Sequence, residues 1–324
     1  MAPAQIVDPH LHFFDPATNP FNAFLGSLGA PTYLPEQYAA AAVDLPISKS
    51  VHVEAVPDDG LAEAQWVNSL ADQGRCSVAG IVASCDLSAS DVATKLDQLS
   101  AVPRVRGIRY ILDYDGPYDG KNPTHRTLTR HGNGKGVDFL RDATEAPKFE
   151  KGFAMLSERG LSFDLQCAPA QLLAAAALLR RHPGVTVCID HLGKLHHFAV
   201  DGSSEDERKL AEWRQGMLLM AELPQVYVKL SMLGHSVPGW HTDIKKEEFL
   251  RSLVREVIDA FGAHRCMFAS NWHINAAVSC SDHAFDTGLE MPELYARFET
   301  WVADLPETDR HRLFAGTASE FYRI

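Results

Sequence analysis

Short apolar segments rich in β-branched residues recur along the chain and alternate with longer segments of helical character. The apolar segments cover residues 5–8, 50–55, 77–83, 105–112, 161–166, 185–190, 226–231 and 266–270. The helical segments between them cover residues 61–73, 91–99, 148–158, 170–181, 205–222 and 246–261. Near-continuous apolar strands that alternate with helices are typical of a parallel sheet covered on both faces. Eight such units favour an α/β fold that closes into a (β/α)8 TIM barrel over an open doubly wound sheet.

The domain organisation follows from the same pattern. No segment of the 324 residues resembles a linker, so we expect residues 1–324 to form a single barrel domain. No glycine-rich phosphate-binding motif follows the first strand, which disfavours a nucleotide-binding fold. The longest irregular segment, residues 113–147, follows the fourth strand, and the active sites of barrels lie at that end of the strands. We expect it to form a lid over the barrel mouth, with a passive insertion as the alternative.

Composition and charge narrow the range of partners. The chain is 46% hydrophobic and 22% charged, with a formal net charge of −12, which disfavours nucleic acid or an anionic membrane as partner. We find neither a secretory signal pattern nor an apolar run of the roughly 18 residues that a membrane span needs. The six cysteines are scattered and contain no CxxC pair, as expected for reduced thiols. We therefore expect a cytoplasmic protein that acts on a small molecule.

Histidines lie at the predicted carboxyl ends of two strands. The first strand leads into "VDPHLHFFD", which contains His10 and His12, and the sixth ends in "CIDHLGK", which contains His191. Strand ends of a barrel meet at one mouth, so these three side chains are expected to converge. Three imidazoles around an open coordination position make a catalytic metal site, typically one for zinc. The sequence therefore predicts a divalent metal, with zinc as the first choice.

Other strand ends supply further candidates. Glu54 follows the second strand as a site carboxylate or, alternatively, as a salt-bridge partner of Arg109 or Lys229. Arg109 in the fourth strand is suited to hold a substrate carboxylate, which implies an anionic substrate, or to act as a structural counter-ion. Trp240 and Trp272 are predicted to form an aromatic wall for a ring-bearing substrate.

The ordered motifs resemble a known family. They are "VDPHLHFFD", "VHVEA", "GIRYIL", "FDLQ", "CIDHLGK", "VYVKLS", "RCMFASNW" and "FAGTASEFYRI". In this order they resemble the amidohydrolase superfamily, and within it the amidohydrolase-2 branch of sugar-lactone and pyrone-dicarboxylate lactonases. The resemblance covers nearly the whole chain. It implies a (β/α)8 barrel, a divalent metal in many members and hydrolysis of a lactone or amide. Some members of the wider group are decarboxylases, and some lactonases act without a metal.

The eighth strand departs from the family pattern. His10 and His12 match the first-strand HxH pair and His191 matches the sixth-strand histidine, but Asn271 stands where the family often has an aspartate that binds metal and activates water. An amide cannot accept that proton at neutral pH. Relatives with "SN" in the eighth strand often have an aspartate four residues later, but here that residue is Asn275.

The base is therefore expected elsewhere. Glu54, Asp113 and His273 are the choices, with Glu54 favoured as the additional carboxylate and His273 as the proton acceptor.

Three functions are compatible with these residues. The leading prediction is a metal-assisted or histidine-assisted hydrolase of a small cyclic ester. The alternative is a non-oxidative decarboxylase of an aromatic or unsaturated acid, which needs no water-activating base. The third is a non-catalytic binder of a small ligand. The joint presence of His10, His12 and His191 argues against it. A homo-oligomer is compatible with each of them.

Overall fold

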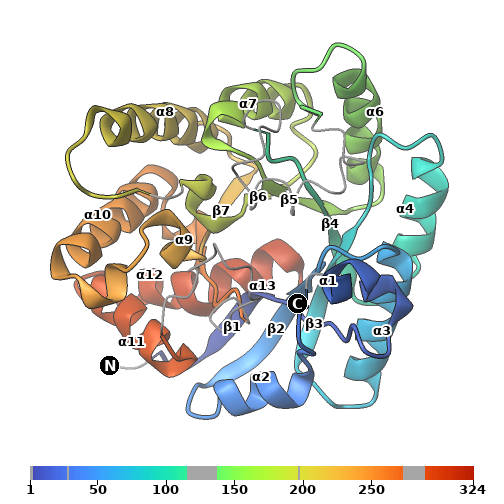
Figure 1. Cartoon of the computed structure of the whole chain (residues 1–324), viewed down its shortest axis with the longest axis horizontal. Helices are drawn as coiled ribbons and strands as arrows, with labels where there is room; N and C mark the ends of the chain where they lie inside the picture. The colour runs from blue at the N-terminus through green and yellow to red at the C-terminus, as the bar shows by residue number, and fades with distance from the viewer. Residues whose placement is uncertain (1–2, 28, 115–136, 196–197, 273–288) are drawn as a thin grey trace.

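The computed structural model describes residues 3–27, 29–114, 137–195, 198–272 and 289–324. Eight parallel strands lie in the order β1-β2-β3-β4-β5-β6-β7-β8 (Figure 1). The strands are β1 (Ile6–Leu11), β2 (Ile47–Val53), β3 (Val78–Ser84), β4 (Val105–Ile111), β5 (Ser162–Gln166), β6 (Val187–Ile189), β7 (Val226–Leu230) and β8 (Cys266–Phe268). A parallel bridge between Leu11 and Trp272 joins the last strand end to the first. The (β/α)8 barrel is confirmed.

Helices surround the strands (Figure 1). They are α1 (Ala23–Ser27), α2 (Pro35–Ala41), α3 (Gly60–Asp72), α4 (Val92–Ser100), α6 (Glu145–Glu158), α7 (Leu172–Arg181), α8 (Ser204–Ala221), α9 (Leu233–Ser236), α10 (Ile244–Phe261), α11 (Met291–Trp301), α12 (Glu307–His311) and α13 (Thr317–Tyr322). In α10, the buried residues recur every three or four positions, which turns one apolar face toward the strands. The Asp243 side chain accepts hydrogen bonds from the first backbone amides of this helix, and Gly262 ends it with a φ of 81°. None of the helices described is long and apolar enough to cross a membrane.

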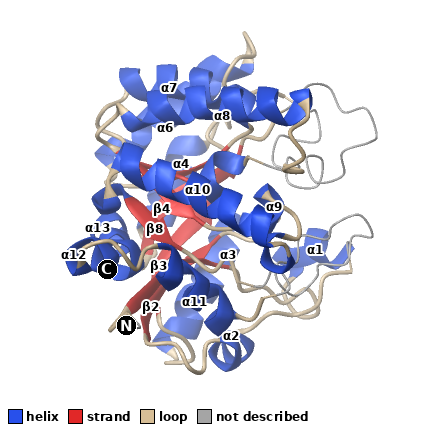
Figure 2. Ribbon diagram, turned by 90° about the vertical axis from the view of Figure 1, so that its left-hand side faces the viewer, coloured by secondary structure: helices blue, strands red, loops and turns tan. Residues whose placement is uncertain are grey.

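Alternation along the strands divides the core into two regions. Val228 and Leu230 of β7 join the large cluster beneath the helices, while Lys229 between them faces the other way. A smaller cluster fills the barrel interior with side chains from the strands, from α13 and from the turn just before it: Val7, Val51, Val53, Val82, Cys188, Met267, Ala315, Ala318, Phe321 and Tyr322. Figure 2 shows α13 at one end of the barrel and α1 and α9 at the other. Apolar residues thus fill the end of the barrel near α13, and charged residues occupy the interior above them.

A buried carboxylate helps to close the barrel. Asp8 of β1 accepts hydrogen bonds from the backbone N of Ser270 at 2.9 Å and from its Oγ at 2.6 Å, and Tyr38 donates to it at 2.8 Å. Burial raises the pKa of Asp8, whereas the Ser270 and Tyr38 hydrogen bonds favour its ionised form. These bonds fix the end of β8 against β1 and thereby place Asn271 at the mouth.

Only the two ends of the predicted lid are described. Residues 115–136 lie outside the described part, so the lid stays a prediction. At the far end of the segment, the Phe139 ring packs against Tyr110 and Phe149, with centroids 5.5 and 6.1 Å away. Helix α6 begins at Glu145, inside the segment predicted to be irregular. That residues 1–324 form one domain also stays a prediction.

Candidate functional site

The structure brings the three predicted histidines together at the carboxyl ends of β1 and β6. The ring centroid of His10 lies 4.9 Å from that of His12 and 4.7 Å from that of His191. All three side chains are buried. Two of them come from one strand end and the third from the opposite side of the barrel, so only the closed barrel makes them neighbours.

Hydrogen bonds orient two of these rings in the same way. The Nδ1 atom of His12 lies 2.8 Å from the carbonyl oxygen of Val53, to which it donates. The Nδ1 atom of His191 lies 3.0 Å from Ser231 Oγ. The carbonyl oxygen leaves Nε2 as the acceptor nitrogen of His12, which is the usual arrangement of metal-binding histidines, and the Ser231 hydroxyl holds His191 in the same arrangement when it accepts from Nδ1. Burial lowers the pKa of His191 to about 3, so this ring is neutral at pH 7.

His10 lies against a buried group of charges. Its Nδ1 is 3.5 Å from Asp190 Oδ1 and 3.1 Å from Lys229 Nζ. Lys229 also donates to Asp164 and lies 3.1 Å from Asp190. Burial acts to raise the pKa of Asp190, but the charge of Lys229 and the contact with His10 outweigh it and hold that pKa well below its usual range. Burial and Lys229 likewise lower the pKa of His10. The pair is therefore an ionised carboxylate beside a neutral imidazole.

Arg109 is held rigidly in the centre of the site. Its Nε donates to Glu54 Oε1 at 2.7 Å, and its Nη2 donates to the Glu54 carbonyl oxygen at 2.6 Å. Its Nη1 faces the histidines at longer range, 3.4 Å from His10 Nε2, 3.3 Å from Gln166 Oε1 and 3.4 Å from Asp190 Oδ2. The second oxygen of Glu54 accepts from Val56 N at 2.8 Å. Both carboxylate oxygens of Glu54 thus have hydrogen bonds already, as the salt-bridge alternative predicted.

Asn271 lies at the mouth in an uncommon backbone conformation. Its φ is 51°, and its side chain is almost completely buried. Within the described part of the chain, neither its Oδ1 nor its Nδ2 has a hydrogen-bond partner. Buried polar atoms are nearly always paired, so this amide is available to a ligand or an ordered water.

Three predicted residues remain, namely Trp272, Trp240 and His273. Trp272 packs against Tyr33 and Tyr38, with centroids 5.4 Å away in both cases. Trp240 is fully buried and packs against Trp301 at 5.2 Å. His273 lies outside the described residues. The aromatic wall and the proton-accepting role of His273 therefore stay predictions.

Several site residues were not selected from the sequence. They are Lys229, Asp190, Gln166 and Lys194, which lie within or just after the predicted strands. The lysine inside the apolar strand "VYVKLS" could have indicated a buried charge group, because a buried cation is tolerated only when carboxylates pair with it. The sequence could not show which carboxylates these are.

The donor set fits a divalent metal ion. Ligand atoms of His10, Asp190 and His191 all lie within 4.8 Å of one another. His12 and His191 are both held at Nδ1, and imidazole is a common ligand of zinc. The residues that would hold such an ion are His10, His12 and His191, with Asp190 within reach of His10 and His191.

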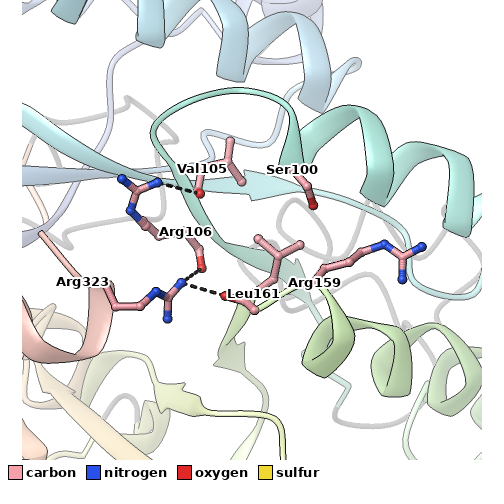
Figure 3. Close-up of a pocket in the computed structure, with 7 residues that line it drawn as sticks. Ser100, Val105, Arg106, Arg159, Leu161 and Arg323 are labelled. Atoms are coloured by element: carbon pink, nitrogen blue, oxygen red, sulfur yellow. Dashed lines mark hydrogen bonds between the residues drawn. The ribbon is translucent and has the colours of Figure 1, made fainter.

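A separate hollow of about 360 Å3 lies at the opposite end of the strands (Figure 3). Arg106, Arg159 and Arg323 line it, but Figure 3 shows their guanidinium groups spread apart rather than aimed at one point. The Arg323 Nη2 donates to the carbonyl oxygens of Arg106 at 3.0 Å and Gly160 at 2.8 Å. These bonds tie the end of α13 to β4 and to the turn before β5, which is a structural role.

Comparison with known proteins agrees with this geometry. The family model described as amidohydrolase matches residues 7–324. The chain belongs to the amidohydrolase family. This amidohydrolase is 30% identical over 247 residues to an L-fucono-1,5-lactonase of Burkholderia ambifaria, covering 76% of this chain and 71% of that protein. It is 26% identical over 325 residues to an L-fucono-1,5-lactonase of Burkholderia multivorans, covering 98% and 96%. A crystal structure of a Burkholderia multivorans amidohydrolase with bound zinc shares the fold, with a TM-score of 0.71, 24% identity and 99% coverage of both chains.

Proposed function

We propose that this amidohydrolase hydrolyses a small cyclic ester, a lactone. The observation that carries the proposal is the convergence of His10, His12 and His191 around Arg109 at the barrel mouth. The two lactonases to which the chain is similar, and the zinc in the related crystal structure, support the same reading.

A divalent metal ion, when bound, supplies a Lewis acid for the ester carbonyl and acidifies a water molecule. His10, His12 and His191 would hold it, and Val53 and Ser231 fix the orientation of His12 and His191. Arg109 Nη1 projects toward the same point because Glu54 already binds Nε and Nη2. A fixed N–H donor at this position stabilises the negative charge that develops on the carbonyl oxygen.

The proton of the attacking water needs an acceptor other than Asn271, whose amide cannot take it. Glu54 is the less suitable of the two favoured choices, since both of its carboxylate oxygens accept hydrogen bonds from Arg109 and Val56. We therefore assign Glu54 to positioning Arg109 and retain His273, which follows β8, as the proposed acceptor.

The test is a proton-release assay with sugar 1,5-lactones, because opening a lactone produces one acid per turnover. We expect turnover by the purified protein and a loss of about 100-fold or more in kcat/KM for His12→Asn. The exposed His264→Asn is the matched control and should keep full activity. Equal activity of wild type and His12→Asn would remove the histidine cluster from the mechanism.

Decarboxylation is the second candidate, and Asn271 is the observation that favours it. Loss of CO2 from an aromatic or unsaturated acid needs an electron sink and a proton donor, but no base that activates water. Release of CO2 from hydroxybenzoates, without any lactone opening, would favour this candidate over the first.

A further inference from the structure

The segment after β6 forms a left-handed turn. Its four residues, His191 to Lys194, have φ values of 56°, 56°, 68° and 52°, and only the third is glycine. Non-glycine residues pay about 1–2 kcal/mol each for this conformation, so a run of them indicates that the surrounding structure enforces it. Trp213 Nε1 donates to the Leu192 carbonyl oxygen at 2.8 Å. A Cβ atom on Gly193 would lie 2.5 Å from Met217 Sδ, so α8 allows only glycine there.

This turn carries Lys194 into a buried ion pair. Lys194 Nζ donates to Asp113 Oδ2, and both side chains are at least 96% buried. Gln166 Nε2 donates to the same oxygen at 3.0 Å, while its Oε1 lies 3.3 Å from Arg109 Nη1. Gln166 therefore connects the ion pair to the guanidinium at the centre of the site. Because Asp113 and Lys194 follow β4 and β6, the pair lies at the same mouth as the histidines.

The pair has unused hydrogen-bonding capacity. Asp113 Oδ1 is buried without a partner in the part of the chain that the structure describes. Lys194 Nζ has three N–H groups and, within the same residues, Asp113 is its one acceptor. Burial and Arg109 lower the pKa of Lys194 to about 7. Buried polar atoms without partners cost about 1–3 kcal/mol each, which a ligand with matching groups would recover.

We propose that Asp113 and Lys194 form a subsite for two neighbouring hydroxyl groups of a polyhydroxylated lactone. One hydroxyl donates to Asp113 Oδ1 and the next accepts from Lys194 Nζ. The positive charge of Lys194 is balanced by Asp113, so the pair suits neutral hydroxyls better than a carboxylate. The substrate class is then a sugar lactone rather than the anionic lactone expected from Arg109. This inference rests on the proposed lactone hydrolysis and adds the specificity of the same site.

The test compares two six-membered lactones, an aldono-1,5-lactone and δ-valerolactone, which has the ring but no hydroxyls. Asp113→Asn and Lys194→Met should each lower kcat/KM for the aldonolactone about 10- to 100-fold, the worth of one hydrogen bond to a charged group. Because δ-valerolactone has no hydroxyls for this subsite, its kcat/KM should fall much less than that of the aldonolactone in both variants. Lys148→Met, which removes an exposed ion pair with Glu145, is the matched control.

Three outcomes would overturn the subsite. They are equal losses on both lactones, no loss on either, and a wild-type preference for a carboxylated lactone that disappears in Lys194→Met.

If the wild type opens neither lactone, the proposed function fails, and calorimetry with the matching 1,5-anhydroalditol then tests the subsite separately. We expect binding to the wild type and at least tenfold weaker binding to Asp113→Asn; equal binding contradicts the inference. Circular dichroism checks that both variants fold, and Lys194→Gln replaces Lys194→Met if the latter does not.

Discussion

The Nζ atom of Lys229 lies 3.1 Å from the Nδ1 atom of His10, in the fully buried interior of the barrel. An ammonium group can only donate, so this contact favours the His10 tautomer that has its proton on Nε2. Asp190 Oδ1, 3.5 Å from the same Nδ1, favours the opposite tautomer. Only the second tautomer leaves Nε2 free for a metal ion. The balance between Lys229 and Asp190 therefore bears on whether His10 can act as a ligand.

Replacing Lys229 tests the buried charge group. Lys229→Met removes the cation that pairs with Asp164 and Asp190 while keeping a similar volume. Because two carboxylates then lack their partner, we expect the free energy of unfolding to fall by about 3–5 kcal/mol in urea denaturation. Adding Asp164→Asn to this variant should restore part of the loss. A loss below about 1 kcal/mol would mean that Lys229 is not the charge that stabilises this interior.

The eighth-strand asparagine should limit metal affinity. If His10, His12 and His191 hold a metal, Asn271 adds only a neutral amide oxygen, which binds cations more weakly than a carboxylate. We expect a low zinc content in native protein purified without chelators or a His-tag, and tighter zinc binding with changed activity in Asn271→Asp. Elemental analysis and zinc titration measure both. A full equivalent of zinc in the native protein, with affinity and rate unchanged by Asn271→Asp, would contradict this role for position 271.

Closure of the barrel should depend on Ser270. Ser270→Ala removes the Oγ donor to Asp8 and the acceptor for Trp272 N, both of which are buried. We expect a loss of about 1–3 kcal/mol in the free energy of unfolding, because Asp8 keeps its charge but loses a partner. Ser252→Ala, on the exposed face of α10, is the control and should change stability by less than about 0.5 kcal/mol. Equal effects of the two substitutions would show that the Ser270 hydroxyl does not contribute to closure.

Buried thiols should make the protein sensitive to alkali. Burial raises the pKa of Cys167 from its ordinary value of 9.0 to about 12. Between these two values the unfolded state releases the thiol proton and the folded state keeps it, so stability falls as pH rises above 9. The slope from this one group is at most about 1.4 kcal/mol per pH unit.

Cys167→Ala isolates that contribution. In urea denaturation at pH 9 and pH 10.5, the variant should lose less stability than wild type over the same interval. Cys76→Ala is the control, since Cys76 is only partly buried. The same pH dependence in wild type and Cys167→Ala would exclude this thiol as a cause.

The sequence by itself determined the architecture and the position of the histidines. Strand and helix patterns depend on local periodicity, so the eight strands were located and the helices that follow β2 to β7 were expected. The predicted end of β1 was wrong. The strand was expected to end at residue 8 but continues to Leu11, because Asp8 and His10 are polar residues inside the barrel and interrupt the apolar pattern. Helices α1, α2, α9, α11, α12 and α13 were not expected.

Only the tertiary structure decided how the charged side chains pair. His10 and Lys229 are 219 positions apart, and Arg109 and Glu54 are 55 apart. No local pattern specifies such contacts, since the parallel registers of eight strands and the closure of the barrel bring them together. The left-handed turn at Lys194 has the same origin, because packing against Trp213 and Met217 imposes a conformation that the local sequence disfavours. Local periodicity thus fixes which elements form, whereas long-range packing and electrostatics fix which side chains meet.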